Sequence, residues 1–181
     1  MKTMNSPNTL FFSLFLLFVV VATGATNLIN QTCKNSSKND PNINYKFCVY
    51  ALQSAPASRC ANITRLGLMS ITLIKHNVTD TRCTIRQLLQ EKKKSMTALK
   101  DCLELYSDSL PTLREATTDY RAKRFVDANE KVSSVMEAAT TCEQGFEDLG
   151  VSPLTQRNDR IFQLSAVALS IMNVLNFHSS E

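Results

Sequence analysis

The sequence has no tryptophan, only four glycines and only two histidines among its 181 residues. Few glycines and little alternation of apolar with polar residues argue against β-sheets, because half-buried strands alternate and tight hairpins need glycine. The histidines, His76 and His178, show no metal-ligand spacing and have no evident nucleophile partner. We therefore expect no metal site, no cofactor and no catalytic centre, so that the protein is not an enzyme and acts through its surface.

Long apolar runs are also scarce, apart from one near the start of the chain. Residues 1–25 combine one positive charge at Lys2, an apolar run from Leu10 to Ala22 and small residues up to Ala25, which is the layout of a secretory signal peptide. The run is shorter than the roughly 20 residues that span a bilayer, and we expect no later membrane anchor. The mature chain is predicted to be secreted and soluble, with a single domain over residues 26–181.

Four N-glycosylation sequons agree with export, and they begin at Asn30, Asn35, Asn62 and Asn77. Neither sign of charge is in large excess. The formal net charge is +4 and falls to +3 when Lys2 is removed with the predicted signal peptide. The lysine run at 92–94 has no interleaved aromatic residues and is interpreted as a solvated loop, so no nucleic-acid partner is expected.

Apolar residues recur at steps of three and four, which is typical of helices. Stripes of this kind predict four long helices at about 61–89, 99–120, 128–149 and from 154 onward. A period near 3.5 with short connections predicts antiparallel neighbours in a bundle spanning 61–178. Pro111 interrupts the second stripe, and we favour one bent helix over a separate helix capped by Ser109.

Residues 28–53 are predicted to form a separate helical hairpin. An amphipathic stretch is followed by a polar turn at 35–42 and then by a helix at 44–53. Cys33 and Cys48 lie on the two arms, and closing a loop of about 15 residues would contribute about 3 kcal/mol. The fold class is therefore all-α, with this hairpin preceding the bundle.

Six cysteines allow about 15 disulfide connectivities, and the sequence by itself does not choose among them. A bond between Cys102 and Cys142 would be compatible with an antiparallel pair of helices. Cys60 and Cys83 would lie about 35 Å apart on one continuous helix, too far for a disulfide. We favour buried or free thiols for these two, ahead of a disulfide across a broken helix and of an intermolecular bridge.

Three segments carry a family resemblance: PNINYKFCVYAL at 41–52, LKDCLELY at 99–106 and TCEQGF at 141–146. Together they resemble the plant invertase and pectin methylesterase inhibitor family, and within it the pollen-allergen branch of proteins described as invertase inhibitors. The resemblance implies an up-down-up-down four-helix bundle stapled by Cys33–Cys48 and Cys102–Cys142. It also implies a monomeric apoplastic inhibitor, with the vacuole as a second location, that forms a one-to-one complex with pectin methylesterase or acid invertase. Cys60, Cys83 and Pro111 depart from the family pattern.

The choice of target depends on the loop between the second and third long helices. Family members aimed at invertase use a Pro-Lys-Phe motif there, whereas those aimed at pectin methylesterase lay bundle helices across the cleft. The corresponding residues here are Lys123, Arg124 and Phe125, without the proline. They form a candidate target-facing loop, but Phe125 could instead cap the core. Because the motif is incomplete, we place pectin methylesterase slightly ahead of invertase (β-fructofuranosidase).

A bundle that carries a small ligand is a weaker alternative. In that hypothesis Tyr106, Tyr120, Met136 and Phe146 would line a cavity, although core packing explains these residues better. The carboxylates Glu143 and Asp148 are interpreted as surface charges.

Overall fold

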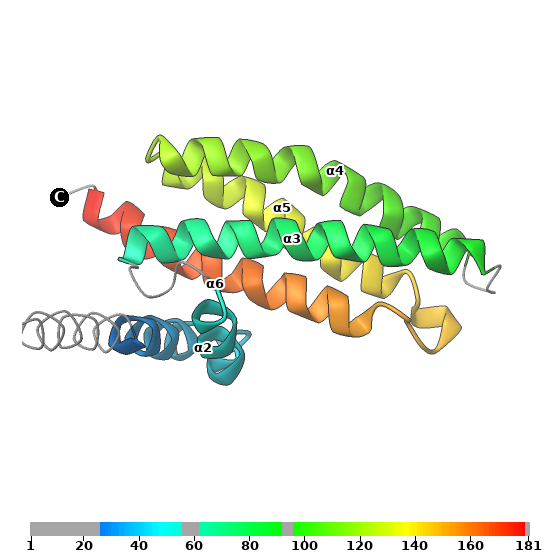
Figure 1. Cartoon of the computed structure of the whole chain (residues 1–181), viewed down its shortest axis with the longest axis horizontal. Helices are drawn as coiled ribbons and strands as arrows, with labels where there is room; N and C mark the ends of the chain where they lie inside the picture. The colour runs from blue at the N-terminus through cyan, green and yellow to red at the C-terminus, as the bar shows by residue number, and fades with distance from the viewer. Residues whose placement is uncertain (1–25, 56–61, 92–95, 180–181) are drawn as a thin grey trace, which may run out of the picture.

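The computed structural model describes residues 26–55, 62–91 and 96–179, and these are helical apart from their connections (Figure 1). Four long helices lie side by side, and a shorter helical hairpin packs against them near one end of the bundle. The expected all-α class and four-helix bundle are confirmed. The predicted signal peptide, Cys60 and the lysine run at 92–94 lie outside the described residues.

The bundle consists of α3 (Ile63–Gln90), α4 (Met96–Arg121), α5 (Phe125–Gln144) and α6 (Thr155–Ser179). Successive helices run in opposite directions, and α3 also packs against α6, which closes the bundle (Figure 1). The third predicted helix ends earlier than expected. After Gln144 the chain forms a turn and the short 3-10 helix η2 (Glu147–Leu149), and Gly150 then takes a left-handed conformation with φ of 78°. Glycine adopts this conformation without a steric penalty.

The predicted apolar stripes form the core of the bundle. Val132, Val135 and Ala139 of α5 are at most 1% exposed. Tyr106, Tyr120 and Phe146 are among the largest fully buried side chains. These three residues of the ligand-carrier alternative therefore fill the core, while Met136 is partly buried against the second cluster of apolar residues under the hairpin.

The hairpin consists of a helix at residues 26–39, a turn and α2 (Tyr45–Gln53). The predicted polar turn at 35–42 begins too early, because the helix continues to residue 39 and the Asp40 N–H still donates to the Ser36 carbonyl at 2.9 Å. Proline follows at position 41, where it cannot extend the helix. The Asn44 side chain then caps α2 by accepting from the Phe47 N–H at 3.0 Å.

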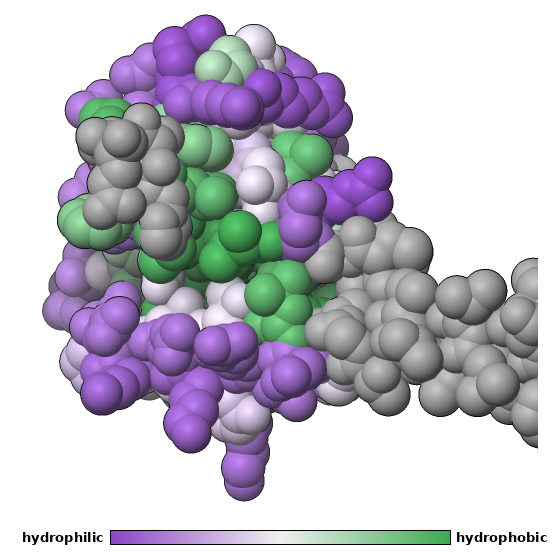
Figure 2. Space-filling model, turned by 90° about the vertical axis from the view of Figure 1, so that its left-hand side faces the viewer, coloured by the Kyte–Doolittle hydropathy of each residue, from purple (hydrophilic) through white to green (hydrophobic). Residues whose placement is uncertain are grey.

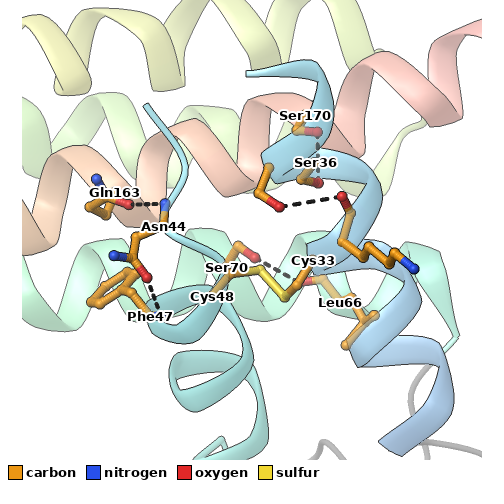
Figure 3. Close-up of a disulfide and its surroundings, with 11 residues drawn as sticks. Cys33, Ser36, Asn44, Phe47, Cys48, Leu66, Ser70, Gln163 and Ser170 are labelled. Carbon is orange, nitrogen blue, oxygen red and sulfur yellow. Dashed lines mark hydrogen bonds between the residues drawn. A yellow bond between two sulfur atoms is a disulfide. The ribbon is translucent and has the colours of Figure 1, made fainter. Parts of the chain in front are cut away.

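Hydrogen bonds to α6 attach the hairpin to the bundle (Figure 3). The Gln163 side chain accepts from the Asn44 N–H at 2.9 Å and donates to the Asn42 carbonyl at 2.7 Å. The hydroxyls of Ser170 and Ser36 lie 2.8 Å apart. Ile29 and Leu52 of the hairpin are also buried in one apolar cluster with Leu66 of α3 and Ile171 of α6. The hairpin thus shares a core with two bundle helices.

Both disulfides implied by the family resemblance are present. Cys33–Cys48 joins the hairpin arms with Cα atoms 5.7 Å apart, and Cys102–Cys142 joins α4 to α5 with Cα atoms 4.9 Å apart. Cys83 is a free, exposed cysteine on α3. Because α3 is continuous, the alternative of a disulfide across a broken helix is wrong.

Pro111 lies inside α4, which runs as one helix from Met96 to Arg121. The alternative of a new helix start at Ser109 is therefore wrong. The Ser109 hydroxyl instead donates to the Leu105 carbonyl one turn earlier, at 2.8 Å.

The most apolar part of α6, Thr155–Phe177, is long and apolar enough to cross a membrane by length and composition alone. This differs from the expectation that no later segment would meet such a test. Half of the apolar window is buried against the rest of the protein. Packing inside the bundle therefore accounts for the buried half of this apolar window.

Candidate functional site

The candidate target-facing loop is the tight turn between α4 and α5. The N–H groups of Lys123 and Arg124 donate to the carbonyls of Tyr120 and Asp119 at 3.0 and 2.9 Å. Lys123 adopts a positive φ of 60°, which is uncommon for a residue with a side chain. The turn is therefore held by backbone hydrogen bonds and presents the Lys123 side chain to solvent.

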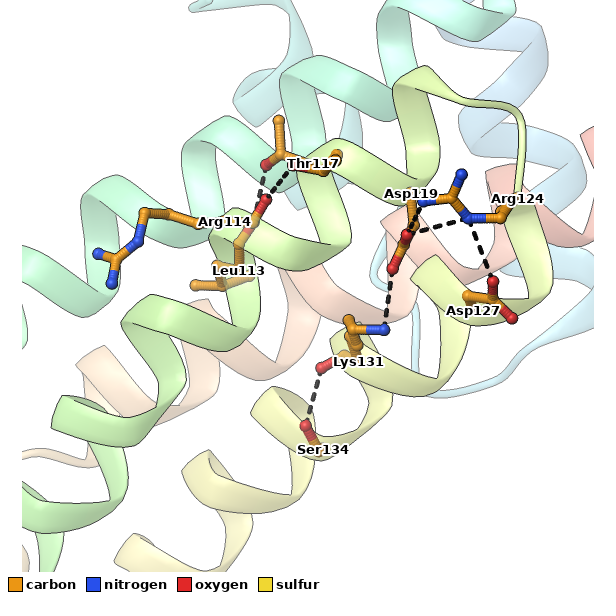
Figure 4. Close-up of polar contacts among 9 residues, drawn as sticks. Leu113, Arg114, Thr117, Asp119, Arg124, Asp127, Lys131 and Ser134 are labelled. Carbon is orange, nitrogen blue, oxygen red and sulfur yellow. Dashed lines mark hydrogen bonds and ion pairs between the residues drawn. The ribbon is translucent and has the colours of Figure 1, made fainter.

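Asp119 is the centre of an ion-pair cluster beneath this turn (Figure 4). Its side chain is only 12% exposed and accepts from Lys131 Nζ of α5 at 2.8 Å. It also pairs with the Arg124 guanidinium, which lies 3.4 Å from Asp127 on its other side. Hydrogen bonds from Lys131 and Arg124 hold the pKa of Asp119 below its ordinary value, and the bond to Asp119 raises the pKa of Lys131.

Phe125 turns inward and is only 5% exposed. Its ring meets the Tyr120 ring edge to face, with centroids 5.2 Å apart, and the Tyr120 hydroxyl donates to the Thr64 carbonyl on α3 at 2.9 Å. Burial raises the pKa of Tyr120. The position of Phe125 thus agrees with the interpretation that this residue caps the core. Val126, the next residue, is 53% exposed.

The three residues of the candidate loop thus have different environments. Lys123 is exposed, Arg124 is half exposed and paired with Asp119, and Phe125 belongs to the core. Sequence reasoning missed Asp119 and Lys131. Nothing in the periodicity distinguishes them, since each is an ordinary charged residue until the turn brings α4 and α5 together.

A second polar cluster joins α4, α5 and α6 at the opposite end of the bundle. The buried Tyr106 hydroxyl donates to Asn158 Oδ1 at 2.6 Å. Glu143 accepts from Asn158 Nδ2 at 2.6 Å and from the Thr155 hydroxyl at 2.5 Å. Burial, and then the Glu143 charge, raise the pKa of Tyr106. Glu143, interpreted from the sequence as a surface charge, is half-buried, and its carboxylate joins α5 to α6.

The remaining candidates for chemistry are isolated. His76 lies 3.7 Å from Asp80 on the solvent side of α3, with 74% of its side chain exposed. Across the described residues, no cluster of three or more histidine, cysteine or acidic side chains could hold a metal ion. The His178 side chain lies outside the described part of the chain.

The predicted glycosylation positions differ in their surroundings. Asn35 and Asn62 are exposed, whereas Asn30 and Asn77 are half-buried. Asn62 also caps α3 by accepting from the Arg65 N–H at 2.8 Å, and Asn77 Nδ2 donates to the Leu73 carbonyl at 2.8 Å. Glycosylation at these four sites stays a prediction.

The wide surface left open by the hairpin is formed by the outer faces of α4 and α5 (Figure 1). Arg114 of α4 and Glu137 of α5 are exposed residues of these two helices. The geometry thus offers two kinds of contact region, a rigid tip at the α4–α5 turn and the helical faces behind it, and neither contains a catalytic constellation.

Comparison with known proteins agrees with this architecture. A model of the family described as "Plant invertase/pectin methylesterase inhibitor" matches residues 27–171. The chain is 34% identical to "Putative invertase inhibitor" of Platanus acerifolia, covering 97% of this chain and 99% of that protein. It is 28% identical to "Pectinesterase inhibitor 12" of Arabidopsis thaliana, covering 90% and 95%.

The fold is also that of a solved crystal structure of a pectin methylesterase inhibitor from Arabidopsis thaliana. The TM-score is 0.61 at 22% identity, and the alignment covers 81% of this chain and 95% of the other. From the family match and the plane-tree relative together, we conclude that the chain belongs to the plant invertase/pectin methylesterase inhibitor family.

Proposed function

We propose that this protein is a secreted inhibitor that blocks the active-site cleft of a plant pectin methylesterase by forming a one-to-one complex in the cell wall. Membership of a family of enzyme inhibitors supports the general activity. The observation that carries the choice of target is the burial of Phe125 in the bundle core.

Phe125 is the aromatic residue that an invertase-directed turn would have to offer. Withdrawing a buried phenylalanine from its core costs about 3–5 kcal/mol, which would subtract from any binding energy gained. Arg124 is likewise held by Asp119. The turn is therefore poorly suited to insertion, and the helical faces remain as the contact surface.

Rigidity supports inhibition by a preformed surface. Ordering a flexible binder on docking weakens affinity, and here a disulfide joins α4 to α5 near one end while the Asp119 ion pairs join them near the other. These helices supply the proposed contact faces.

Acid invertase is the second candidate target. Two plane-tree relatives at 34% identity bear the name of an invertase inhibitor. Lys123 and Val126 are exposed at the tip of the turn and could enter a cleft without disturbing Phe125.

The deciding experiment is to titrate the oxidised, processed protein into a plant pectin methylesterase and, separately, into an acid invertase at acidic pH. We expect saturable loss of pectin methylesterase activity that is complete near one equivalent. Full retention of both activities across a panel of isoforms would overturn the inhibitor proposal, and loss of invertase activity alone would establish the second candidate.

Surface variants distinguish the two contact regions. If the helical faces bind the target, Arg114→Glu or Glu137→Arg should weaken inhibition at least about tenfold, because reversing a charge in an interface costs several kcal/mol. The tip variants Lys123→Ala and Val126→Ser serve as matched controls and should leave pectin methylesterase inhibition unchanged. The opposite pattern would assign the contact to the turn.

A further inference from the structure

A groove runs between the hairpin and the C-terminal half of α6. Its larger part has a volume of about 770 Å³ and is lined by the end of the 26–39 helix, by Asn129 of α5 and by residues 166–177 of α6. A smaller part of about 200 Å³ continues along the 26–39 helix toward Leu28. The two parts share Asn39, Ser170 and Val174, so we treat them as one groove.

Figure 2 views the molecule from the end at which α6 finishes and shows an apolar area between two hydrophilic rims. Val174 and Phe177, in the last turns of α6, are 39% and 67% exposed. Contiguous exposed apolar surface often marks a site for a ligand or partner. The chemistry of the residues that line the groove then indicates which kind of occupant it suits.

The polar lining of the groove is rich in side-chain amides. Asn39, Asn129 and Asn173 line its larger part, and Asn129 Nδ2 donates to Asn173 Oδ1 at 3.1 Å. This contact does not use the Asn129 carbonyl, which is an acceptor, or the Asn173 amino group, which is a donor. Leu169 and Val174 supply apolar surface between them.

The side-chain amides and the aliphatic surface of the groove together fit a neutral sugar. Sugar hydroxyls both donate and accept hydrogen bonds, as amides do, while the C–H faces of the rings pack on aliphatic side chains. Asp40 is the only charged residue among those that line the groove in the described part of the chain, and its carboxylate already accepts from the Asn42 N–H at 2.9 Å. Without a lining lysine or arginine, the groove is not suited to an anionic polymer.

Asn35 lines the smaller part of this groove and is exposed. It begins the sequon Asn35-Ser36-Ser37 and lies one helical turn before Asn39, so that the two side chains are neighbours on one helix face. The other three sequon asparagines, Asn30, Asn62 and Asn77, do not line the groove.

We propose that Asn35 carries an N-linked glycan whose first sugars lie in this groove and join the hairpin to α6. The donor is a lipid-linked oligosaccharide diphosphate of the secretory pathway. Asn35 Nδ2 bonds to the anomeric carbon as the bond from that carbon to the diphosphate oxygen breaks. The lipid diphosphate leaves, and the displaced amide proton passes to a base of the transferase. The glycan covers Val174 and lies beside the Ser36–Ser170 contact.

The test is glycan release by a peptide N-glycanase from the full chain secreted by a plant cell, followed site by site by mass spectrometry. We expect Asn35 to be occupied. The glycan at Asn35 should be released about tenfold more slowly from the native protein than from the denatured protein, a factor equivalent to about 1.4 kcal/mol. Both release rates are first divided by the rate for an exposed control glycan. Asn62, where occupied, provides this control, and otherwise a glycopeptide does.

Variants of the groove make the test specific. Asn173→Ala and Val174→Asp should accelerate release from Asn35 while leaving site occupancy and the release rate of the control glycan unchanged. Ser37→Ala removes the sequon and should expose the apolar groove to a hydrophobic dye, whereas Thr64→Ala, which removes the Asn62 sequon without touching its cap, should not. An unoccupied Asn35, or release as fast in the native wild-type protein as in the groove variants, would overturn the proposal.

Discussion

Gly67 of α3 lies against the ring of Tyr120 on α4. A Cβ at position 67 would lie 2.1 Å from the Tyr120 hydroxyl oxygen and 2.7 Å from Cζ, so the ring would have to move. That ring is held by its hydrogen bond to the Thr64 carbonyl and by contact with Phe125. Close approach of α3 and α4 at this point therefore requires glycine.

We predict that Gly67→Ala lowers the free energy of unfolding by about 1–3 kcal/mol, the usual cost of overpacking. Denaturant titration monitored by circular dichroism measures the change. Gly145→Ala is the matched control, since a Cβ at position 145 would lie 3.4 Å from its nearest neighbour, the Cys142 carbonyl oxygen. Equal stability of Gly67→Ala and wild type would show that Tyr120 can move freely.

Asp119 has a pKa below its ordinary value of 3.8, because Lys131 and Arg124 stabilise the carboxylate. A carboxyl group whose pKa is lower in the folded state stabilises the fold above its unfolded pKa, and this contribution disappears as the pH falls through the folded pKa. Asp119→Asn should therefore lower the Tm at pH 6, and the difference from wild type should shrink as the pH approaches 3.

Thermal unfolding followed across this pH range tests the prediction. Asp127→Asn is the control, since Asp127 is half exposed and lies 3.4 Å from Arg124. A difference in Tm that stays constant between pH 6 and pH 3 would mean that the Asp119 charge does not stabilise the turn.

At the scale of elements, the Cys102–Cys142 disulfide closes a 40-residue loop that contains most of α4 and α5. In the chain-entropy model a loop of this length contributes about 4 kcal/mol, and the shorter hairpin loop about 3 kcal/mol. Both cysteines are 1% exposed, so alanine can replace them without placing a new polar group in the core.

The double variant Cys102→Ala/Cys142→Ala should lose about 4 kcal/mol of unfolding free energy in a denaturant titration. Cys83→Ala, at the exposed free cysteine of α3, should change stability by less than about 0.5 kcal/mol. A loss as small as that of the control would mean that the bundle holds α4 and α5 together without the bond.

At the scale of the whole molecule, the apolar residues form two clusters. One fills the four-helix bundle, and the other lies between the hairpin, α3 and α6. The hairpin contributes only a few buried apolar side chains, such as Ile29 and Leu52, so it depends strongly on Cys33–Cys48. Regions with few buried contacts open locally before the whole protein unfolds.

We predict that Cys33→Ala/Cys48→Ala increases amide hydrogen exchange across residues 26–53 while the centres of α3 to α6 remain protected. Exchange measured by mass spectrometry on peptides from both regions distinguishes local from global opening. A uniform loss of protection would show that the hairpin and the bundle unfold as one unit.

The sequence by itself determined the fold class and the four helices of the bundle. A repeat of three and four residues is a local property, and it predicts which face of each helix is buried before any partner is known. The segments 41–52, 99–106 and 141–146 also indicated the family, which the comparison confirmed. The disulfide pairs followed from that resemblance, since the number of cysteines alone leaves many connectivities open.

The tertiary structure decided how the surface is used. Only the packing of α3, α4 and α5 places Phe125 against Tyr120 and brings Lys131 to Asp119, and only the docking of the hairpin on α6 forms the amide-lined groove beside Asn35. Local periodicity describes one helix at a time. Exposure, ion pairing and grooves arise between helices, because they depend on distances between residues that are far apart in the chain.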